Sequence, residues 1–544
     1  MSDSYACAQA VLAQLVSQGV REIVLCPGSR SAPLALAAQA ADRAGAVRLH
    51  VRVDERTAGF VALGLAKADG RPAAVITTSG TAVANLTPAV LEAHHSAVPL
   101  IVIAADRPAA LVGFGANQTT EQSDLFGGFV RYRARMSSAA PAASWRAQAA
   151  RAVVLAEGAL GGDPGPVHLN VELGLPLVPA GGPREWPDEL PTPLVAPARG
   201  GGSPVQLPGR PRTVVLAGDA SPAVGAVARS LAEASRLPLL AEPSSNARFG
   251  PNAISTARLL LGTDLGARIE RVLVFGRPTL SRPVSALLAR QDVEIVVVSD
   301  RSDFPDQGWR AALVAPALAV EPGPAEWLAD WQAADARWRE HVDVTLTETG
   351  TLTGPELAAR VLAATPADAV LVLASSNPIR DADLAPIGQV SVPSYANRGL
   401  SGIDGTISTA IGLALASGRP GVLLCGDLAF THDAGALAIG PDEPRPDLRI
   451  VVADDAGGSI FATLEYGAPA FAQAFERVFA TPTGVDPAVL AAGYGVAARR
   501  VAAEELDAAL AAPIIGLEVL VVALDRSGRA QLSARLSVGP SATE

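Results

Sequence analysis

Residues 53–80 read VDERTAGFVALGLAKADGRPAAVITTSG and decide the fold of the first third of the chain. A helical run from Glu55 to Ala68 is followed by the apolar run AAVITTS at 73–79, which has the length and composition of a buried strand. The same alternation extends to both sides, with strand-like runs at 23–26, 49–53, 99–106 and 167–173. Short apolar runs separated by helices predict βαβ units and a parallel sheet.

This alternation returns twice further along the chain. Strand-like runs begin at 213, 271 and 293, and again at 369, 421, 448 and 517. The intervening stretch 181–212 is dense in proline and glycine, which is typical of an extended linker. We therefore predict an α/β protein of three doubly wound, mainly parallel-sheet domains in series. The predicted ranges are 1–180, the linker 181–212, 213–345 and 346–544.

Length and composition exclude several classes of protein. The 544 residues are too many for one small binding module, and 49% hydrophobic with 18% charged residues excludes a disordered chain or a coiled coil. A net charge of −11 argues against a nucleic-acid partner. Three cysteines form no disulfide framework, and the sequence shows no signal peptide and no apolar run of the ~18 residues that a spanning helix needs. We expect a cytoplasmic protein without a transmembrane segment.

Ligand sites in such folds lie beyond the carboxyl ends of the strands. The chain lacks G-x-G-x-x-G after its first strand and lacks a P-loop, which excludes the simplest nucleotide sites. Asp427 and Asp455 each end a predicted strand, one helix and one strand apart. Two carboxylates with backbone carbonyls and a diphosphate would suit Mg²⁺, and Gly457 and Gly458 would let the backbone approach phosphates. The alternative is that both aspartates cap helices.

Glu55 and several arginines are further candidates. Glu55 follows a strand and opens a helix, where an acid is favoured by the helix dipole, or where a dry site would let it share a proton with a ligand nitrogen. Lys67 is the only lysine, so arginine supplies nearly all positive charge. Arg30, Arg380 and Arg398 lie in loops where a guanidinium could bind a carboxylate with two hydrogen bonds, although each alone is more often a structural ion pair.

A set of motifs carries a resemblance over nearly the whole chain, weakest in its central part. These are PGSRSAPLALA (27–37), the stretch 53–90, ADRP (105–108), GANQTT (115–120), YANRGLSGIDGTISTAIGLA (395–414), GDLAF and DDAGGSIF. Together they resemble the thiamine-diphosphate enzyme superfamily. Within it, GSRS, GANQ and NRG-x-SGIDG are similar to the 2-succinyl-5-enolpyruvyl-6-hydroxy-3-cyclohexene-1-carboxylate synthases of menaquinone biosynthesis.

This resemblance implies a cofactor, an assembly and a reaction. The first domain would bind the pyrimidine of thiamine diphosphate, and the last domain its diphosphate with Mg²⁺ or Mn²⁺. The active site would lie between subunits of a homodimer, and dimers could pair into a tetramer. The reaction would decarboxylate 2-oxoglutarate and add the resulting succinyl carbanion to isochorismate. Both substrates are dicarboxylates, which the arginines in these loops would suit.

The resemblance also assigns residues by matching motifs. Glu55 matches the catalytic glutamate that hydrogen-bonds N1′ of the aminopyrimidine. The metal ligands match Asp427, Asp455 and the Gly457 carbonyl, and Asp455 stands where many superfamily members have asparagine. The cofactor contacts match Gly402, Ile403, Gly426, Gly458, Ile460 and Phe461. The substrate contacts match Ser29, Arg30, Asn117, Gln118, Arg282, Ser376, Arg380, Arg398 and Leu464. Arg107 lies in a matching motif without an assigned contact.

One departure and two alternatives stay open. A lysine sometimes found beside Arg282 in the family is here Ser281, which puts substrate contact from the central domain in doubt. The chain could instead be another thiamine-diphosphate 2-oxoacid decarboxylase or acetolactate-type carboligase, whose smaller substrates would not need three arginines. A catalytically silent regulatory homologue is a third reading, which the presence of Glu55, Asp427 and Asp455 disfavours. Arg277 and Arg301 could form an anion site in the central domain.

Overall fold

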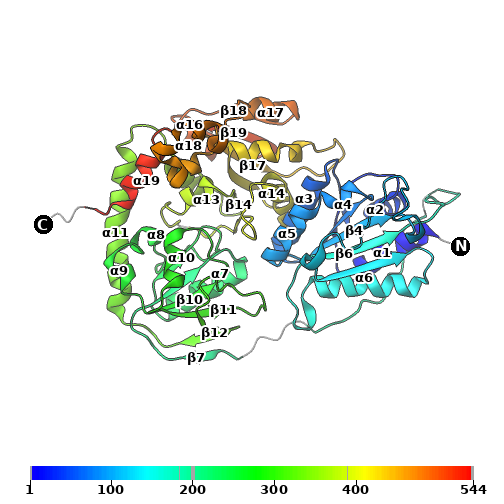
Figure 1. Ribbon diagram of the computed structural model, residues 1–544, viewed down its shortest axis with the longest axis horizontal. Coiled ribbons are helices and arrows are strands. Elements are labelled where there is room, and N and C mark those ends of the chain that lie inside the picture. Colours follow the sequence, from blue (N-terminus) through cyan, green and yellow to red (C-terminus); the bar gives the residue numbers. More distant parts are fainter. Residues whose placement is uncertain (1–2, 183, 198–202, 389, 541–544) are drawn as a thin grey trace. The chain divides into compact units, whose positions relative to one another are not determined.

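Three parallel sheets carry the fold, as Figure 1 shows. The computed structural model describes residues 3–182, 184–197, 203–388 and 390–540. Contacts between residues divide the chain into two units. The first unit contains Met1–Gly200, Gly399–Arg419 and His432–Asp447, and the second contains Gly201–Arg398, Pro420–Thr431 and Leu448–Glu544.

The sheet of the first unit has the strand order β2-β1-β3-β4-β6-β5, with every neighbouring pair parallel. Its strands are β1 (Glu22–Leu25), β2 (Arg48–Val51), β3 (Ala73–Thr77), β4 (Leu100–Asp106), β5 (Tyr132–Ser137) and β6 (Val167–Glu172). Its helices are α1 (Ser4–Ser17), α2 (Ala32–Arg43), α3 (Glu55–Asp69), α4 (Thr81–Ala84), α5 (Thr87–Ser96), α6 (Ala142–Ala156) and α14 (Thr406–Ser417).

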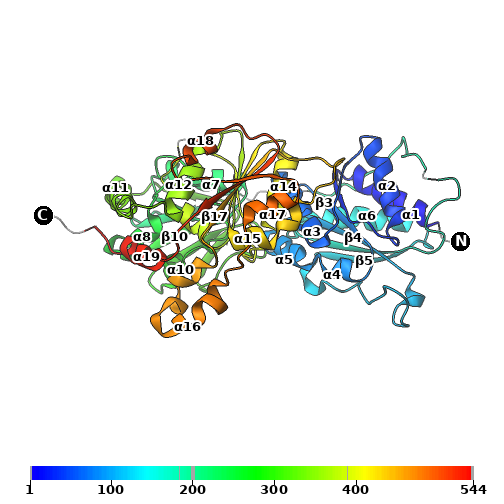
Figure 2. The same cartoon turned by 90° about the horizontal axis from the view of Figure 1, so that it is seen from above.

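Two groups of helices bury this sheet. Apolar residues of α1, α2 and α6 form one core cluster with alternate residues of the strands, such as Ile23, Ile76 and Ile103. The second group is α3, which packs on β1 and β3, together with α5 and α14. Figures 1 and 2 both show α14 beside α3, although the two helices lie far apart in the sequence.

Glycines allow α3 and α14 to pack this closely. A Cβ atom on Gly64 would lie 2.2 Å from the carbonyl oxygen of Thr409, and one on Gly412 would lie 2.2 Å from that of Val61. The two backbones therefore touch without intervening side chains, and α14 supports the helix whose first residue is Glu55.

The second unit holds two larger sheets and one short strand pair. The central sheet has the order β12-β11-β10-β8-β9, and the last sheet has the order β15-β14-β16-β17-β19-β18. The central strands are β8 (Thr213–Ala217), β9 (Leu239–Ala241), β10 (Arg271–Phe275), β11 (Glu294–Val298) and β12 (Ala311–Ala315), and the pair is β7 (Val205–Leu207) with β13 (Leu318–Val320). The last sheet has β14 (Val370–Leu373), β15 (Ser394–Tyr395), β16 (Gly421–Gly426), β17 (Leu448–Asp454), β18 (Ala497–Arg500) and β19 (Leu517–Ala523).

Helices of the second unit alternate with these strands. They are α7 (Pro222–Ala234), α8 (Ala257–Leu260), α9 (Asp264–Ala267), α10 (Arg282–Ala289), α11 (Ala325–Thr347), α12 (Gly354–Ala364), α13 (Asn377–Ala382), α15 (Asp427–His432), α16 (Ala472–Ala474), α17 (Pro487–Gly493), α18 (Leu506–Ala511) and α19 (Arg529–Ser537). The long helix α11 buries Trp327, Trp331 and Trp338 in the core of the central sheet. Within the described ranges, no helix is both long enough and apolar enough to cross a membrane.

The predicted α/β class with mainly parallel sheets is confirmed, and every apolar run named above contains a strand. The strand β7 lies inside the predicted linker 181–212, of which residues 183 and 198–202 are outside the described residues. The three domain boundaries stay a prediction, because the two units are defined by contacts rather than by sheets.

Candidate active site

In the first unit, several candidate residues follow the carboxyl ends of neighbouring parallel strands. Arg30 follows β1, Glu55 follows β2, Ser79 follows β3 and Arg107 follows β4. Because these strands are parallel and adjacent, the four residues lie along one edge of the sheet, where α/β proteins bind their ligands. The order of the strands, rather than the order of the sequence, brings them together.

Glu55 is the first residue of α3 and is half-buried. Asp54 caps the helix, since its carboxylate accepts hydrogen bonds from the backbone N–H of Arg56 at 2.9 Å and of Thr57 at 3.4 Å. The thiol of Cys26, at the end of β1, has its pKa raised by burial first and then by the nearby charge of Glu55. Glu55 is thus free of the capping role and faces the carboxyl end of β1.

The predicted substrate residues of this unit are held by short contacts. The Arg30 guanidinium donates to the carbonyl of Leu173 at 2.7 Å, and its pKa is lowered by burial and then by the positive charge of Arg107. Two cations kept near each other in this way suit an anionic ligand. The Gln118 amide donates to the carbonyl of Ser79 at 3.0 Å, and the Ser79 hydroxyl donates back to the carbonyl of Gln118 at 2.8 Å. Ser29 and Asn117 are exposed.

The segment that carries Gly402 and Ile403 also belongs to the first unit. The Glu92 carboxylate of α5 accepts hydrogen bonds from the backbone N–H groups of Gly399 and Leu400, both at 2.8 Å. Glu92 is buried, so this contact anchors the segment firmly, and Ile403 is left half-buried. This supporting role of Glu92 could not be predicted from the sequence, because its partners lie more than 300 residues away.

In the second unit, Asp427 and Asp455 follow the adjacent strands β16 and β17. Asp427 comes directly after Gly426 and occupies the first turn of α15. Burial raises the pKa of Asp427 to about 7, helped by the negative charge of Asp455, and burial raises the pKa of Asp455 to about 6. Asp427 is buried and Asp455 is half-buried, and two carboxylates that repel each other are suited to a hard divalent cation, which would relieve that repulsion. The capping reading of Asp427 is compatible with this arrangement.

Gly457 has a backbone conformation and a close contact that favour glycine. Gly457 has φ +141°, and a Cβ atom there would lie 2.5 Å from the carbonyl oxygen of Ala480. Nη1 of Arg526 lies 2.9 Å from the same Cβ position, is buried and has no hydrogen-bond partner among the described residues. Arg526 pairs through its Nη2 with the Glu476 carboxylate, so Nη1 is the nitrogen that it could offer to an anionic ligand.

A hydrogen-bond chain fixes the loop after β17. The Asn377 amide donates to the Ser459 hydroxyl at 2.6 Å, and that hydroxyl donates to the Asp455 carboxylate. The 3₁₀ turn Ser459–Thr463 then carries Ile460 and Phe461, and Leu464 ends it. A Cβ on Gly458 would lie 2.9 Å from the Phe461 ring, so the ring packs directly on this glycine.

Ser376, Arg380 and Arg398 cluster near the ends of β14 and β15. Ser376 has φ +80°, and its carbonyl accepts a hydrogen bond from the Arg380 guanidinium at 2.8 Å. The pKa of Arg380 is lowered by burial and then by the charge of Arg398. Arg282, in contrast, is exposed and forms a 2.8 Å ion pair with Glu465. The structure therefore joins Arg380 with Arg398 and gives Arg282 an acidic partner within the protein.

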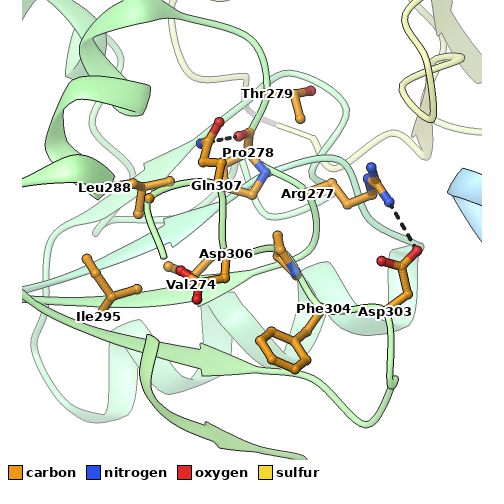
Figure 3. A pocket seen from close by; sticks show the side chains of 12 residues that line it. Val274, Arg277, Pro278, Thr279, Leu288, Ile295, Asp303, Phe304, Asp306 and Gln307 are labelled. Carbon is orange, nitrogen blue, oxygen red and sulfur yellow. Dashed lines mark hydrogen bonds and ion pairs between the residues drawn. The ribbon is translucent and has the colours of Figure 1, made fainter. Parts of the chain in front are cut away.

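A cavity of about 270 Å³ lies at the end of β10 in the central sheet (Figure 3). Arg277 lines it and lies 3.8 Å from the Asp303 carboxylate, while the Gln307 amide donates to the carbonyl of Pro278 at 3.2 Å. The described lining does not include Arg301. Of the two arginines that could form an anion site, only Arg277 borders this cavity.

Comparisons with known proteins identify the family. A family model described as the N-terminal TPP binding domain of thiamine pyrophosphate enzymes matches residues 6–126. A 2-succinyl-5-enolpyruvyl-6-hydroxy-3-cyclohexene-1-carboxylate synthase from Kineococcus radiotolerans is 52% identical, over 97% of both chains. The chain belongs to this synthase family. Synthases of the same name from Nocardioides sp. and Paenarthrobacter aurescens are 49% and 48% identical, over 98% and 99% of this chain and 97% of each relative.

A solved structure extends the comparison to the fold. The benzoylformate decarboxylase from Polynucleobacter necessarius aligns with a TM-score of 0.68 and 16% identity, covering 96% of this chain and 99% of that one. The membership in the synthase family confirms the resemblance seen in the sequence, and the matching domain confirms a thiamine-diphosphate enzyme. The roles of individual residues stay predictions.

Proposed function

We propose that the chain decarboxylates 2-oxoglutarate and adds the remaining succinyl unit to isochorismate. The products would be 2-succinyl-5-enolpyruvyl-6-hydroxy-3-cyclohexene-1-carboxylate and CO₂, in menaquinone biosynthesis. The observation that carries this proposal is identity of 48–52% to synthases of that name over almost the entire chain. The clustered arginines support it, because both substrates are dicarboxylates.

The residues of the second unit would hold the cofactor through its diphosphate. Asp427, Asp455 and the Gly457 carbonyl would bind Mg²⁺ or Mn²⁺, and Arg526 would offer its unpaired nitrogen to the phosphate oxygens. Gly426 and Gly458 would allow close approach, while Ile460 and Phe461 would form an apolar wall. Ile403, in the first unit, stays a predicted cofactor contact. When bound, thiamine diphosphate supplies the electron sink that makes decarboxylation feasible.

Glu55 would hold a proton at N1′ of the aminopyrimidine. A carboxyl group at this position favours the tautomer in which the adjacent amino nitrogen can accept a proton. Arg30, Arg380 and Arg398 would bind substrate carboxylates, with charged hydrogen bonds worth about 1.5–3 kcal/mol each. Ser29, Asn117, Gln118, Ser376 and Leu464 would complete the substrate site. Arg282 would have to leave Glu465 to take part, so its role is the weakest supported.

The proposed assembly is a homodimer in the cytoplasm, with the active site at the subunit interface. The three cysteines are free and buried, which fits a reducing compartment. Size-exclusion chromatography with light scattering should give about twice the chain mass of 55.3 kDa, or four times that mass for a tetramer. A stable monomer that turns over substrate would contradict the shared site.

The decisive experiment supplies the protein with Mg²⁺, thiamine diphosphate and 2-oxoglutarate, with and without isochorismate, and follows CO₂ and product. We expect product formation and CO₂ release to rise together when isochorismate is present. Faster CO₂ release from pyruvate would favour a decarboxylase or an acetolactate-type carboligase. Cofactor binding without turnover of any 2-oxoacid would favour a silent homologue.

A further inference from the structure

Glu242 is a buried carboxyl group at the edge of the central sheet. It follows β9, and its backbone N–H donates to the carbonyl of Ala217, the last residue of β8, at 2.9 Å. Its Oε1 accepts a hydrogen bond from the backbone N–H of Leu280 at 2.9 Å. Its Oε2 is buried and has no hydrogen-bond partner among the described residues. The proposed function gives Glu242 no role, although one of its oxygens is unsatisfied.

Arg398 contacts Thr279, the residue that precedes Leu280. It is 2% exposed, and its Nη2 donates to the carbonyl of Thr279 at 3.1 Å and to the Thr279 hydroxyl at 3.0 Å. Its Nε is buried without a hydrogen-bond partner in the described part of the chain. Thr279 and Leu280 are consecutive, so one turn contacts the Arg398 guanidinium and the Glu242 carboxyl at the same time. Figure 3 shows Thr279 at this turn.

The charges around Glu242 come from two residues. Burial raises its pKa to about 8, the positive charge of Arg398 opposes this rise, and the negative charge of Asp383 adds to it. Asp383 in turn lies among Arg258, Arg248 and Arg380. Burial therefore favours the neutral form of Glu242 beside the guanidinium of Arg398.

We propose that Glu242 is a positioning residue for Arg398 in substrate binding. As a neutral acid it fixes the turn of Thr279 and Leu280 against the guanidinium and leaves the charge of Arg398 for a substrate carboxylate. As a carboxylate it partly compensates that charge and weakens the attraction for substrate. This inference rests on the proposed function, which assigns Arg398 to the substrate.

The incomplete pairing of Arg398 supports this view. Among the described residues, the hydrogen bonds of the buried Arg398 side chain go to the uncharged Thr279, and a substrate carboxylate would supply a compensating anion. A bound carboxylate near Glu242 would in turn favour the neutral form of Glu242. Substrate binding and the proton on Glu242 are thus linked, and each strengthens the other.

The test measures KM and kcat of the holoenzyme for 2-oxoglutarate and for isochorismate between pH 6.5 and 9.5. In the wild type, we expect KM for the substrate that binds Arg398 to rise above pH 8, by about fivefold or more at pH 9.5. In Glu242→Gln, a neutral side chain that still accepts from Leu280, KM should stay nearly constant with pH. A rise in the variant equal to that in the wild type would overturn the proposal.

Three further variants separate positioning from a structural role. Arg398→Ala should raise KM at every pH and remove its pH dependence. Thr279→Val, which removes one contact to Arg398, should raise KM and keep the pH dependence. Asp335→Asn changes another carboxylate of the same unit, which accepts from Thr256 at 2.7 Å, and should keep the wild-type pH profile. If Glu242→Gln raised KM by the same factor at every pH and kept the wild-type pH dependence, Glu242 would have a structural role only.

A binding measurement keeps this inference distinct from the proposed reaction. Calorimetry with 2-oxoglutarate and with isochorismate, each on the holoenzyme in a Glu55→Gln background, reports affinity without turnover. The positioning role is supported if the affinity for one of these substrates falls above pH 8 with Glu242 present and does not fall in Glu242→Gln. This holds even if the wild type fails to make the expected product. The positioning role is overturned if, with Glu242 present, the affinities for both substrates do not change with pH, even if product forms.

Discussion

Glu55 stands at the first turn of α3, beside the end of β1, and does not cap the helix, because Asp54 does. We expect Glu55→Gln to bind thiamine diphosphate and Mg²⁺ with nearly unchanged affinity and to lose most turnover. The amide cannot exchange a proton with N1′, and removal of such a group lowers rates by about 10²–10⁴-fold. Steady-state kinetics together with calorimetric titration of the cofactor would measure both effects.

The matched control for this variant is Glu157→Gln. Glu157 ends α6, is exposed and lies outside the candidate residues. It should leave both turnover and cofactor affinity at wild-type values. Wild-type turnover in Glu55→Gln would remove Glu55 from the proton transfer.

At this scale, candidate site residues could be proposed from the sequence more readily than the residues that support them. Asp427 and Asp455 could be proposed because each ends an apolar run and carries a suitable oxygen. Glu92 and Glu242 could not be proposed in this way. Glu92 contacts Gly399 and Glu242 contacts Leu280, and both partners lie in other elements. Such contacts depend on the packing of elements, which no local pattern records.

At the scale of elements, the strands that escaped prediction share a position. They are β5, β7, β9, β12, β13, β15 and β18, and each lies at the edge of its sheet. Edge strands are less covered by helices, so they need no continuous apolar run; YRARMS in β5 and AARR in β18 are examples. The central strands are buried on both faces, so they need continuous apolar runs, and these runs could be recognised in the sequence.

The N-terminus of α14 is held by an acid from another element. The buried Asp433 carboxylate accepts from the backbone N–H of Ser408 at 2.8 Å and from its hydroxyl at 3.0 Å, and burial raises the pKa of Asp433 to about 7. At pH values between 3.8, the ordinary pKa of an aspartate, and about 7, Asp433 is protonated in the folded state and ionised in the unfolded state. Stability from this group is therefore lost as pH rises through that window and is constant above it.

Asp433→Asn should remove this loss while keeping an acceptor for Ser408. We expect the free energy of unfolding of the variant, relative to wild type, to increase between pH 4.5 and 7.5 by about 3 kcal/mol and then to level off. Urea unfolding at several pH values would measure it. Asp42→Asn, an exposed acid of the same unit, is the control and should show no such trend. A pH-independent difference for Asp433→Asn would contradict the assignment.

The crossing of α3 and α14 gives a second prediction for this scale. In Gly412→Ala, the new methyl group would lie 2.2 Å from the Val61 carbonyl oxygen, so the helices must separate. We expect a loss of about 1–3 kcal/mol, larger than the helix propensity that alanine gains. Thermal unfolding would measure it against Gly493→Ala in α17, where a Cβ meets nothing within 4 Å and stability should not fall.

At the scale of the whole molecule, the metal site should control cofactor affinity. The carboxylates of Asp427 and Asp455 would repel a diphosphate unless a cation lay between them. We expect chelation by EDTA to weaken thiamine diphosphate binding strongly, and Mg²⁺ or Mn²⁺ to restore it. With both present at about 100 times their dissociation constants, stabilisation of the fold by about 2.7 kcal/mol per site should raise the melting temperature.

Asp427→Asn tests the assignment of this site. The variant should bind thiamine diphosphate weakly with or without Mg²⁺, whereas Asp507→Asn, an exposed acid on α18, should respond as the wild type does. Tight cofactor binding to the metal-free protein would show that the carboxylates serve another purpose.

The support of α3 by α14 also sets an order of events during synthesis. The N-terminal unit is completed by Gly399–Arg419 and His432–Asp447, so a ribosome must translate to residue 447 before that unit can close. Until α14 has been translated, the surface of α3 around Gly64 stays uncovered in the nascent chain. Folding from the N-terminus, the usual course for consecutive domains, is thereby delayed for the part of the chain that bears Glu55.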